Sequence, residues 1–282
     1  ERGITHRALR HNNLFFLDET RELVVLGDFV SSPAGFDQPV VYETIEKSMA
    51  DEGGRGIGQI ADDMYALGVT LAFLVQKRLP VFGNSKEQII LKKIEGSTFR
   101  SIVGKNLITA TMMEPLRGLL NDDPAERWGI EQLENWKSGL PNIVNPVVPP
   151  ERAHRPMTLD GYDHLYPRGL AYSMAQRPEV AIKLIKGGSI ERWIKKDLMN
   201  EELSASFAAS IDLTKLQSGK SKEGEPVLLS QVLILLDPLA PIRYKGVSYM
   251  PDALGTALVT EHARNGDPRI LAESVVYKII DT

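Results

Sequence analysis

Asp63 is the carboxylate with the clearest local setting in this sequence, because it opens a run, residues 63–74, that is apolar on nearly all sides. Such a run predicts a helix in the centre of a domain. A carboxylate at a helix start can accept hydrogen bonds from backbone N–H groups and meets the positive end of the helix dipole. The plain interpretation of Asp63 is therefore an N-cap, and a second interpretation depends on the polar motifs that flank the helix.

Three such motifs accompany the helix. They are Ile4-Thr-His6-Arg7-Ala8-Leu-Arg-His-Asn-Asn13-Leu, then Leu26-Gly-Asp28-Phe-Val, and finally Asn121-Asp-Asp-Pro-Ala-Glu-Arg127-Trp. In this order and at these spacings, residues 1–138 resemble the C-terminal lobe of the protein-kinase fold. The first motif resembles the catalytic loop, the second resembles Asp-Phe-Gly, and Asp63 to Gly68 resembles the Asp-x-x-x-x-Gly of the large central helix.

The resemblance implies which catalytic parts are kept and which are lost. The family's metal ligands fall on Asn13 and Asp28, and both residue types are retained. The catalytic aspartate falls on Ala8, whose methyl group cannot accept a proton. Loss of a positioned general base typically slows a reaction by ~10²–10⁴-fold. We therefore expect no catalytic residue at this position, with Mg and ATP as possible rather than required cofactors.

Structural roles follow from the same resemblance. His6 and Arg7 are expected to be kept for structure, and Asp63 is expected to brace the catalytic loop from below. Glu43 lies where the family ends its activation segment, so we expect a partly buried Glu43–Arg127 ion pair that ties this segment to the lobe. The alternative is two unrelated surface charges, because most charged side chains are simply solvated.

Three functional hypotheses follow. The first is a bacterial kinase-like pseudokinase that acts as a scaffold or regulator through protein–protein contacts. The second is a Mg-nucleotide-binding switch that uses Asn13 and Asp28, and the third is a weakly active Ser/Thr phosphotransferase. A kinase also needs a strand-rich N-terminal lobe before its catalytic loop. We expect that lobe, or another protein, to cover apolar surface on residues 1–138, and a homo-oligomer is a further possibility.

Composition narrows the classes of partner. The net charge of −4 disfavours nucleic acid. The chain has no cysteine, which excludes disulfides and thiolate metal sites and fits a reducing, cytoplasmic compartment. No apolar run approaches the ~18 residues typical of a membrane span.

The fold class expected is mainly α, with a kinase-like helical lobe, one short β-hairpin and a second, mostly helical domain. Two apolar runs around Asp18-Glu19-Thr20 predict the hairpin at 14–17 and 23–26. Ser85 and Gln88 form a predicted capping box. A Gly-rich run at 51–60 lacks the strand, helix and lysine of a phosphate loop, so it predicts a flexible loop. Helices are predicted at 61–77, 85–96, 107–120 and 129–137.

The prolines of residues 139–155 predict a linker, followed by a domain at 156–282. Within it, 156–174 and 241–258 read as two copies of a hairpin, a turn and a helix that begins near a proline. Trp193 is a predicted core residue. His154 and His164 lie near Asp160 and Asp163, where turn polarity explains them better than a metal site. Further helices are predicted at 168–186, with Pro178 as a possible break, and at 189–196, 200–216 and 226–235.

Overall fold

A computed structural model describes residues 4–27, 33–105, 108–142, 150–218 and 224–279. The chain divides into two compact units. The first comprises Glu1–Ser48 and Arg55–Val147, and the second comprises Met49–Gly54 and Val148–Thr282. The later change of unit falls within the predicted linker 139–155. The assignment of residues 49–54 to the second unit differs from the sequence-based boundaries, which place them in the first domain.

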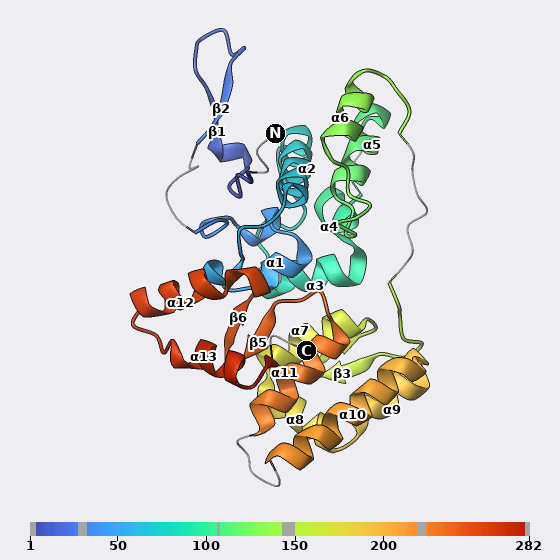
Figure 1. The fold of residues 1–282 in the computed structure, drawn as a ribbon. Helices are drawn as coiled ribbons and strands as arrows, with labels where there is room; N and C mark the ends of the chain where they lie inside the picture. Colours follow the sequence, from blue (N-terminus) through green and yellow to red (C-terminus); the bar gives the residue numbers. More distant parts are fainter. Residues whose placement is uncertain (1–3, 28–32, 106–107, 143–149, 219–223, 280–282) are drawn as a thin grey trace. The chain divides into compact units, whose positions relative to one another are not determined.

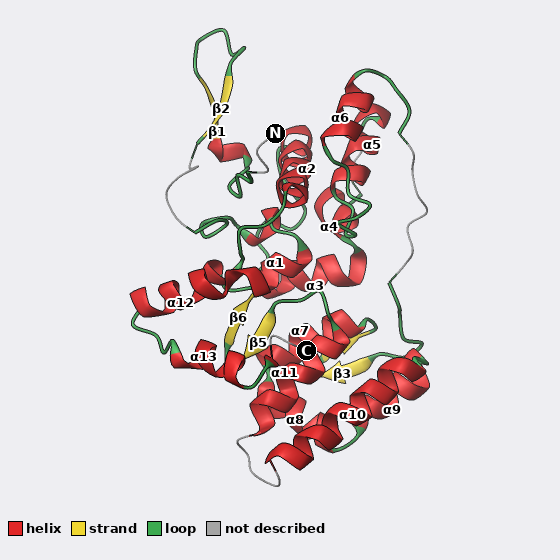
Figure 2. Cartoon of the chain, viewed as in Figure 1, coloured by secondary structure: helices red, strands yellow, loops and turns green. Residues whose placement is uncertain are grey.

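The first unit is mainly helical and carries one short hairpin, as predicted (Figure 2). Its helices α1 and α4 escaped prediction because one or two turns are too short to show a helical period. Its elements are η1 (His11–Asn13), β1 (Leu14–Phe16), β2 (Val24–Leu26), η2 (Val40–Tyr42), α1 (Ile45–Met49), α2 (Ile60–Gln76), α3 (Lys86–Gly96), α4 (Thr98–Val103), α5 (Ala110–Leu119) and α6 (Ile130–Lys137).

Helix α2 lies at the centre of the first unit, as its apolar sequence predicts. Tyr65, Val69 and Ala72 on α2 are fully buried, and α5 packs along the helix with Leu116 (Figure 1). The capping box predicted at the start of α3 is present, because Gln88 N–H donates to Ser85 Oγ at 3.2 Å and the Gln88 side chain accepts from Ser85 N–H at 3.0 Å.

The hairpin β1–β2 exposes much of its apolar surface. Its strands pair antiparallel, with Phe16 opposite Val24, and each of these two side chains is more than half exposed. Phe15 and Leu23 are exposed to a similar degree. Apolar surface of this kind was expected on the first unit. Among the described residues, no helix combines the length and the apolar character that a membrane crossing requires.

The second unit is also mainly helical, and Trp193 is buried in its core, as predicted, where its indole N–H donates to the Arg155 carbonyl at 2.8 Å. The predicted helix 168–186 is two helices, because Pro178 begins a new one after Arg177, whose backbone leaves the helical region at φ −134° and ψ 63°. The elements are η3 (Glu52–Gly54), β3 (Met157–Leu159), β4 (Tyr162–His164), α7 (Pro167–Gln176), α8 (Pro178–Lys186), α9 (Ser189–Trp193), the π-helical η4 (Ile194–Leu198), α10 (Glu201–Ser218), α11 (Glu225–Leu236), β5 (Ile242–Tyr244), β6 (Val247–Tyr249), η6 (Pro251–Ala253), α12 (Leu254–Ala263) and α13 (Arg269–Val276).

The two predicted repeats have the same local structure. We call β3–β4 with α7 the first hairpin module, and β5–β6 with α12 the second. Each hairpin closes with a two-residue turn whose residues both have positive φ, 50° and 84° at Asp160-Gly161 and 47° and 88° at Lys245-Gly246. Such turns match the twist of paired strands and favour glycine at the second position. In each module a proline then begins the next helical segment.

The prediction of a flexible loop at residues 51–60 is wrong for its first part. Residues 52–54 form η3, and three backbone hydrogen bonds hold 51–54: Gly54 N–H to Asp51 O, Asp51 N–H to Ser248 O and Met250 N–H to Gly54 O. The pairing residues are nearly two hundred positions away in the sequence, so local composition could not reveal them.

Candidate functional site

The carboxylate of Asp63 binds the backbone of the loop 6–13. His6 N–H donates to Oδ2 at 2.6 Å and Arg7 N–H donates to Oδ1 at 2.8 Å. These are the contacts expected of a brace. The N-cap interpretation is wrong, because α2 is capped by Gln59 and its N3 residue Asp62, whose carboxylate accepts from Gln59 N–H at 2.7 Å. Asp63 is therefore left available to hold a second segment.

Asn13 holds the other end of this loop. It is buried, and its Nδ2 donates to the carbonyl oxygens of Ala8 and Gly27, each at 2.8 Å. Its Oδ1 is buried and has no hydrogen-bond partner among the residues that the structure describes. The amide of Asn13 thus joins the loop to the end of the hairpin β1–β2. Asp28, the second predicted metal ligand, lies outside the described residues.

Arg7 points into a buried cluster of charges. Its Nη2 lies 2.9 Å from Glu43 Oε2 and its Nη1 lies 3.7 Å from Asp62 Oδ2. Arg55 approaches the other oxygen of Glu43 at 3.8 Å, and Lys47 approaches Asp62 at 3.7 Å. Each carboxylate therefore lies between two cations. Buried charges need such neighbours, because an uncompensated charge away from water is strongly destabilising.

The predicted Glu43–Arg127 pair is wrong. The guanidinium of Arg127 donates to the carbonyl oxygens of Asn121 at 2.9 Å and Ala61 at 3.2 Å, and it lies 5.3 Å from the ring centroid of Tyr65. Arg127 therefore holds the first turn of α2. The cations near Glu43 are instead Arg7 and Arg55. Arg55 lies in the segment that was predicted to be a flexible loop.

Burial and charge act in opposite directions on the two partners of the central pair. Burial raises the pKa of Glu43, while Arg7 and Arg55 oppose that rise. Burial alone would lower the pKa of Arg7, but Glu43 and Asp62 raise it on balance. The opposite charges of Arg7 and Glu43 thus offset the cost of removing both groups from water.

Residues 33–43 are fixed to this cluster along their length. Arg55 Nη1 donates to Gly35 O at 2.6 Å and also to Gln38 O. Gln38 Nε2 donates to Leu9 O at 3.1 Å, and Arg10 Nη1 donates to Asp37 O at 3.1 Å. Residues 33–43, which lead up to Glu43 at the predicted end of the activation segment, are therefore bound to the loop 6–13 and to Arg55 by hydrogen bonds.

Lys93 is a buried residue of this site that the sequence analysis missed. Its Nζ donates to the carbonyl oxygens of Val40 at 2.9 Å, Val41 at 3.3 Å and Glu43 at 2.7 Å. The side chain is fully buried, and burial lowers the pKa of Lys93 to about 7. A signal was present in the sequence, because Lys93 follows Ile89 and Ile90 at helical spacing on the apolar face of α3.

The described residues contain no group of three His, Asp or Glu side chains that could together hold a metal ion. His164 is buried at the end of β4, and His154 donates its backbone N–H to Asp197 O at 2.8 Å. The local chemistry at the loop 6–13 is thus that of a braced backbone with a methyl group at position 8. The side chain at position 8 cannot accept a proton, and the nearest imidazole, that of His6, accepts a hydrogen bond from Ala8 N–H at 3.3 Å.

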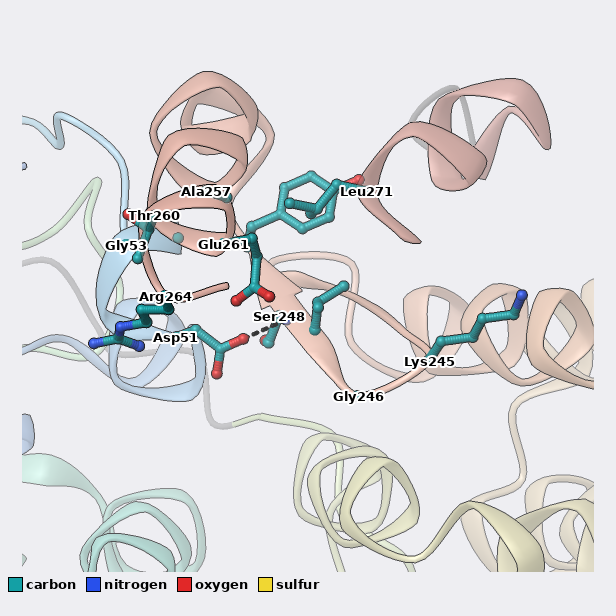
Figure 3. Close-up of a pocket in the computed structure, with 13 residues that line it drawn as sticks. Asp51, Gly53, Lys245, Gly246, Ser248, Ala257, Thr260, Glu261, Arg264 and Leu271 are labelled. Atoms are coloured by element: carbon teal, nitrogen blue, oxygen red, sulfur yellow. Dashed lines mark hydrogen bonds between the residues drawn. The ribbon is translucent and has the colours of Figure 1, made fainter. Parts of the chain in front are cut away.

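The second unit contains a cavity of about 340 Å³ between η3, the β5–β6 turn and α12 (Figure 3). Glu261 on α12 directs its carboxylate toward this space, and Tyr249 and Leu271 supply apolar wall. Two cations of the lining are already paired, Lys245 with Glu273 at 2.5 Å and Arg264 with Glu52 at 2.8 Å. The lining also includes the carboxylates of Asp51 and Glu261 and the hydroxyls of Ser248 and Thr260.

Comparisons of this chain with protein-family models, with curated proteins and with solved structures gave no match.

Proposed function

We propose that this protein is a kinase-like pseudokinase that acts as a scaffold or regulator through protein–protein contacts. The observation that carries the proposal is the held loop. Asp63 binds the backbone of His6 and Arg7, and Asn13 binds the carbonyl of Ala8. The backbone on both sides of residue 8 is held in place, while residue 8 itself is an alanine.

The chemistry of phosphoryl transfer explains why this matters. The protein must supply metal ligands and a carboxylate that orients the attacking hydroxyl and takes its proton. Alanine supplies neither function. Hydrogen bonds and buried ion pairs nevertheless maintain the loop, which favours a role for its shape over a role in turnover.

The surroundings of the loop support regulation by contact. Residues 33–43 are held by contacts with Arg7, Arg55 and Lys93. The hairpin β1–β2 beside the loop presents exposed Phe15, Phe16 and Val24, and apolar surface of this kind commonly marks an interaction site. A fixed segment and an exposed apolar hairpin suit a protein whose surface is bound by a partner protein.

The test is calorimetric titration of Mg·ATP into the full chain, together with a phosphotransfer assay on generic acceptor proteins. We expect no transfer above background and no heat of binding up to millimolar ATP. Transfer that disappears in the Asp28→Ala variant would overturn the proposal. Asp18→Ala, in the turn of the hairpin β1–β2, is the matched control for a nearby carboxylate.

A second candidate is a Mg-nucleotide-binding switch. It is favoured by one observation: the buried Oδ1 of Asn13 has no hydrogen-bond partner within the described part of the chain. An amide oxygen in this state suits a hard cation such as Mg²⁺. Micromolar binding of Mg·ATP that is lost in both Asn13→Ala and Asp28→Ala, but kept in Asp18→Ala, would favour the switch over the scaffold.

A further inference from the structure

We infer that the second hairpin module is a docking site for a short Asp-x-Gly-Gly segment, occupied in this chain by residues 49–54, which we call the strap. The strap binds the edge of β6 that does not face β5. Asp51 N–H donates to Ser248 O at 2.9 Å, and Met250 N–H donates to Gly54 O at 2.7 Å. The strap is not an extended strand, because residues 52–54 form η3, but its backbone groups satisfy the free edge of β6, as peptide ligands do when they bind at a sheet edge.

An aspartate side chain completes the contact. Asp51 Oδ2 accepts a hydrogen bond from Ser248 N–H at 2.8 Å, the dashed line in Figure 3. Ser248 Oγ in turn donates to Met49 O at 3.0 Å. Both backbone groups and the hydroxyl of Ser248 are therefore engaged by the strap. Position 51 favours a carboxylate, which accepts from a backbone N–H more strongly than a neutral group does.

Two glycines are required by the close approach of the module. A Cβ on Gly53 would overlap the side chain of Thr260 on α12. A Cβ on Gly54 would overlap the Ser248 carbonyl oxygen and lie 2.9 Å from Tyr249 Cα, which is backbone and cannot rotate away. The Gly-Gly pair is thus part of the recognition, and the Gly-rich composition is explained by docking rather than by flexibility.

The first hairpin module provides an independent parallel. At the position that corresponds to Met250, Leu165 O accepts a hydrogen bond from Ala153 N–H at 2.8 Å. Ala153 is buried and, like the strap glycines, is small. In both modules, therefore, the residue just after the second strand forms a backbone hydrogen bond with a small residue of another segment, Ala153 in the first and Gly54 in the second. In the first module the segment comes from the adjoining chain, and in the second it comes from residues far away in the sequence.

The strap is held in a way that permits exchange. Its contacts are mainly backbone hydrogen bonds, and its ion pair Glu52–Arg264 is half exposed on both sides. The cavity of about 340 Å³ borders the strap at Asp51, Gly53 and Gly54, so part of the strap faces open space although its two glycines contact the module closely. A peptide of the same sequence should compete for the module. This inference does not depend on the proposed function.

The test uses the full chain carrying Gly54→Val and a fluorescein-labelled peptide of residues 47–56, Lys-Ser-Met-Ala-Asp-Glu-Gly-Gly-Arg-Gly. We expect saturable binding, measured by fluorescence anisotropy, to the Gly54→Val chain. The native chain should bind at least about tenfold more weakly, because its own strap competes. The same peptide with valine in place of the second glycine of its Gly-Gly pair should not bind. Absence of peptide binding to a Gly54→Val chain whose helices α7–α11 keep their amide-exchange protection would overturn the inference.

A matched control and a second variant keep the test decisive if Gly54→Val does not fold. Gly255→Ala places a Cβ in open space on α12 and should leave amide exchange of residues 49–54 unchanged. Gly53→Ala should speed that exchange about tenfold, consistent with local opening, and Thr260→Gly should restore it in the double variant by removing the clashing side chain. Unchanged exchange in Gly53→Ala, or no recovery in the double variant, would refute the docking contact.

Discussion

Two ion pairs in this molecule share their chemistry and nearly their length but differ in surroundings. Arg7 and Glu43 in the first unit lie 2.9 Å apart with 3% and 1% of their side chains exposed. Arg264 and Glu52 in the second unit lie 2.8 Å apart, and each side chain is 50% exposed. Judged by distance alone, the two pairs would contribute equally to stability. Their burial predicts that they respond very differently to the loss of one partner.

The physical reason lies in the solvent. Water stabilises an exposed charge when its partner is removed, so an exposed pair contributes little. A buried charge has no such substitute, and the remaining partner carries the whole penalty of desolvation. The polar region around Arg7 should therefore be sensitive to substitution at each buried position, and the strap periphery should be tolerant of change in its charges.

The largest effect is expected for Arg7→Met, which leaves Glu43 buried beside Arg55 alone. We expect the free energy of unfolding of the first unit to fall by about 3–5 kcal/mol. Urea unfolding can be followed by fluorescence in a Trp193→Phe background, which retains only Trp128 and Trp136, both in the first unit. Adding Glu43→Gln should recover part of the loss. A loss below about 1 kcal/mol would contradict the importance of burial.

Asp63→Ala is expected to come next. It leaves two backbone N–H groups, those of His6 and Arg7, without their acceptors, at a cost of about 2–3 kcal/mol. Asp63→Asn retains one acceptor oxygen, so its loss should be intermediate. The same unfolding measurement applies. An unchanged midpoint in Asp63→Ala would reject the brace, with the exposed Asp18→Ala as the reference for a carboxylate without such a role.

Lys93 predicts a pH dependence. Burial lowers its pKa from 10.5 to about 7, so between these values the unfolded chain binds more protons than the folded one. Stability contributed by this residue therefore rises as pH increases from about 7 to 10. Unfolding midpoints of the native chain and of Lys93→Met should diverge in this direction over that window. Lys92→Met, one position away and exposed, should run parallel to the native chain.

The smallest effect is expected for Arg264→Ala. Loss of its exposed pair with Glu52 should cost less than about 1 kcal/mol, and high salt should remove most of the difference. Amide exchange of residues 49–54 at low and high salt measures this directly. A large, salt-independent loss would erase the contrast between the two pairs and would mean that Arg264 anchors the strap in another way.

Local features of the fold followed from local sequence. The hairpin around Asp18, the capping box at Ser85 and the chain break at Pro178 each depend on residues within a few positions of one another. The two hairpin modules were also visible, because Asp160-Gly161 and Lys245-Gly246 meet the backbone demands of their turns. Such preferences act over one or two turns of chain and need no knowledge of the core.

The candidate site was only partly predictable. The contact of Asp63 with the loop 6–13 followed from a resemblance in order and spacing, whereas the partner of Glu43 did not. Several arginines could have reached that carboxylate, and only the packed structure decides which guanidinium lies within 4 Å of it. The burial of Lys93 was not predicted either, because a charged residue is normally expected on the exposed face of a helix.

The sequence by itself determined the longer helices, the hairpins and the alanine at position 8. Only the tertiary structure decided that Glu43 is held by Arg7 and Arg55, that Lys93 is buried among carbonyls, and that residues 49–54 pair with β6. The physical reason is the distance along the sequence over which each interaction acts. Turns and caps are set by neighbours along the chain, whereas ion pairs and strand edges are satisfied by whichever groups the packing of the core brings together.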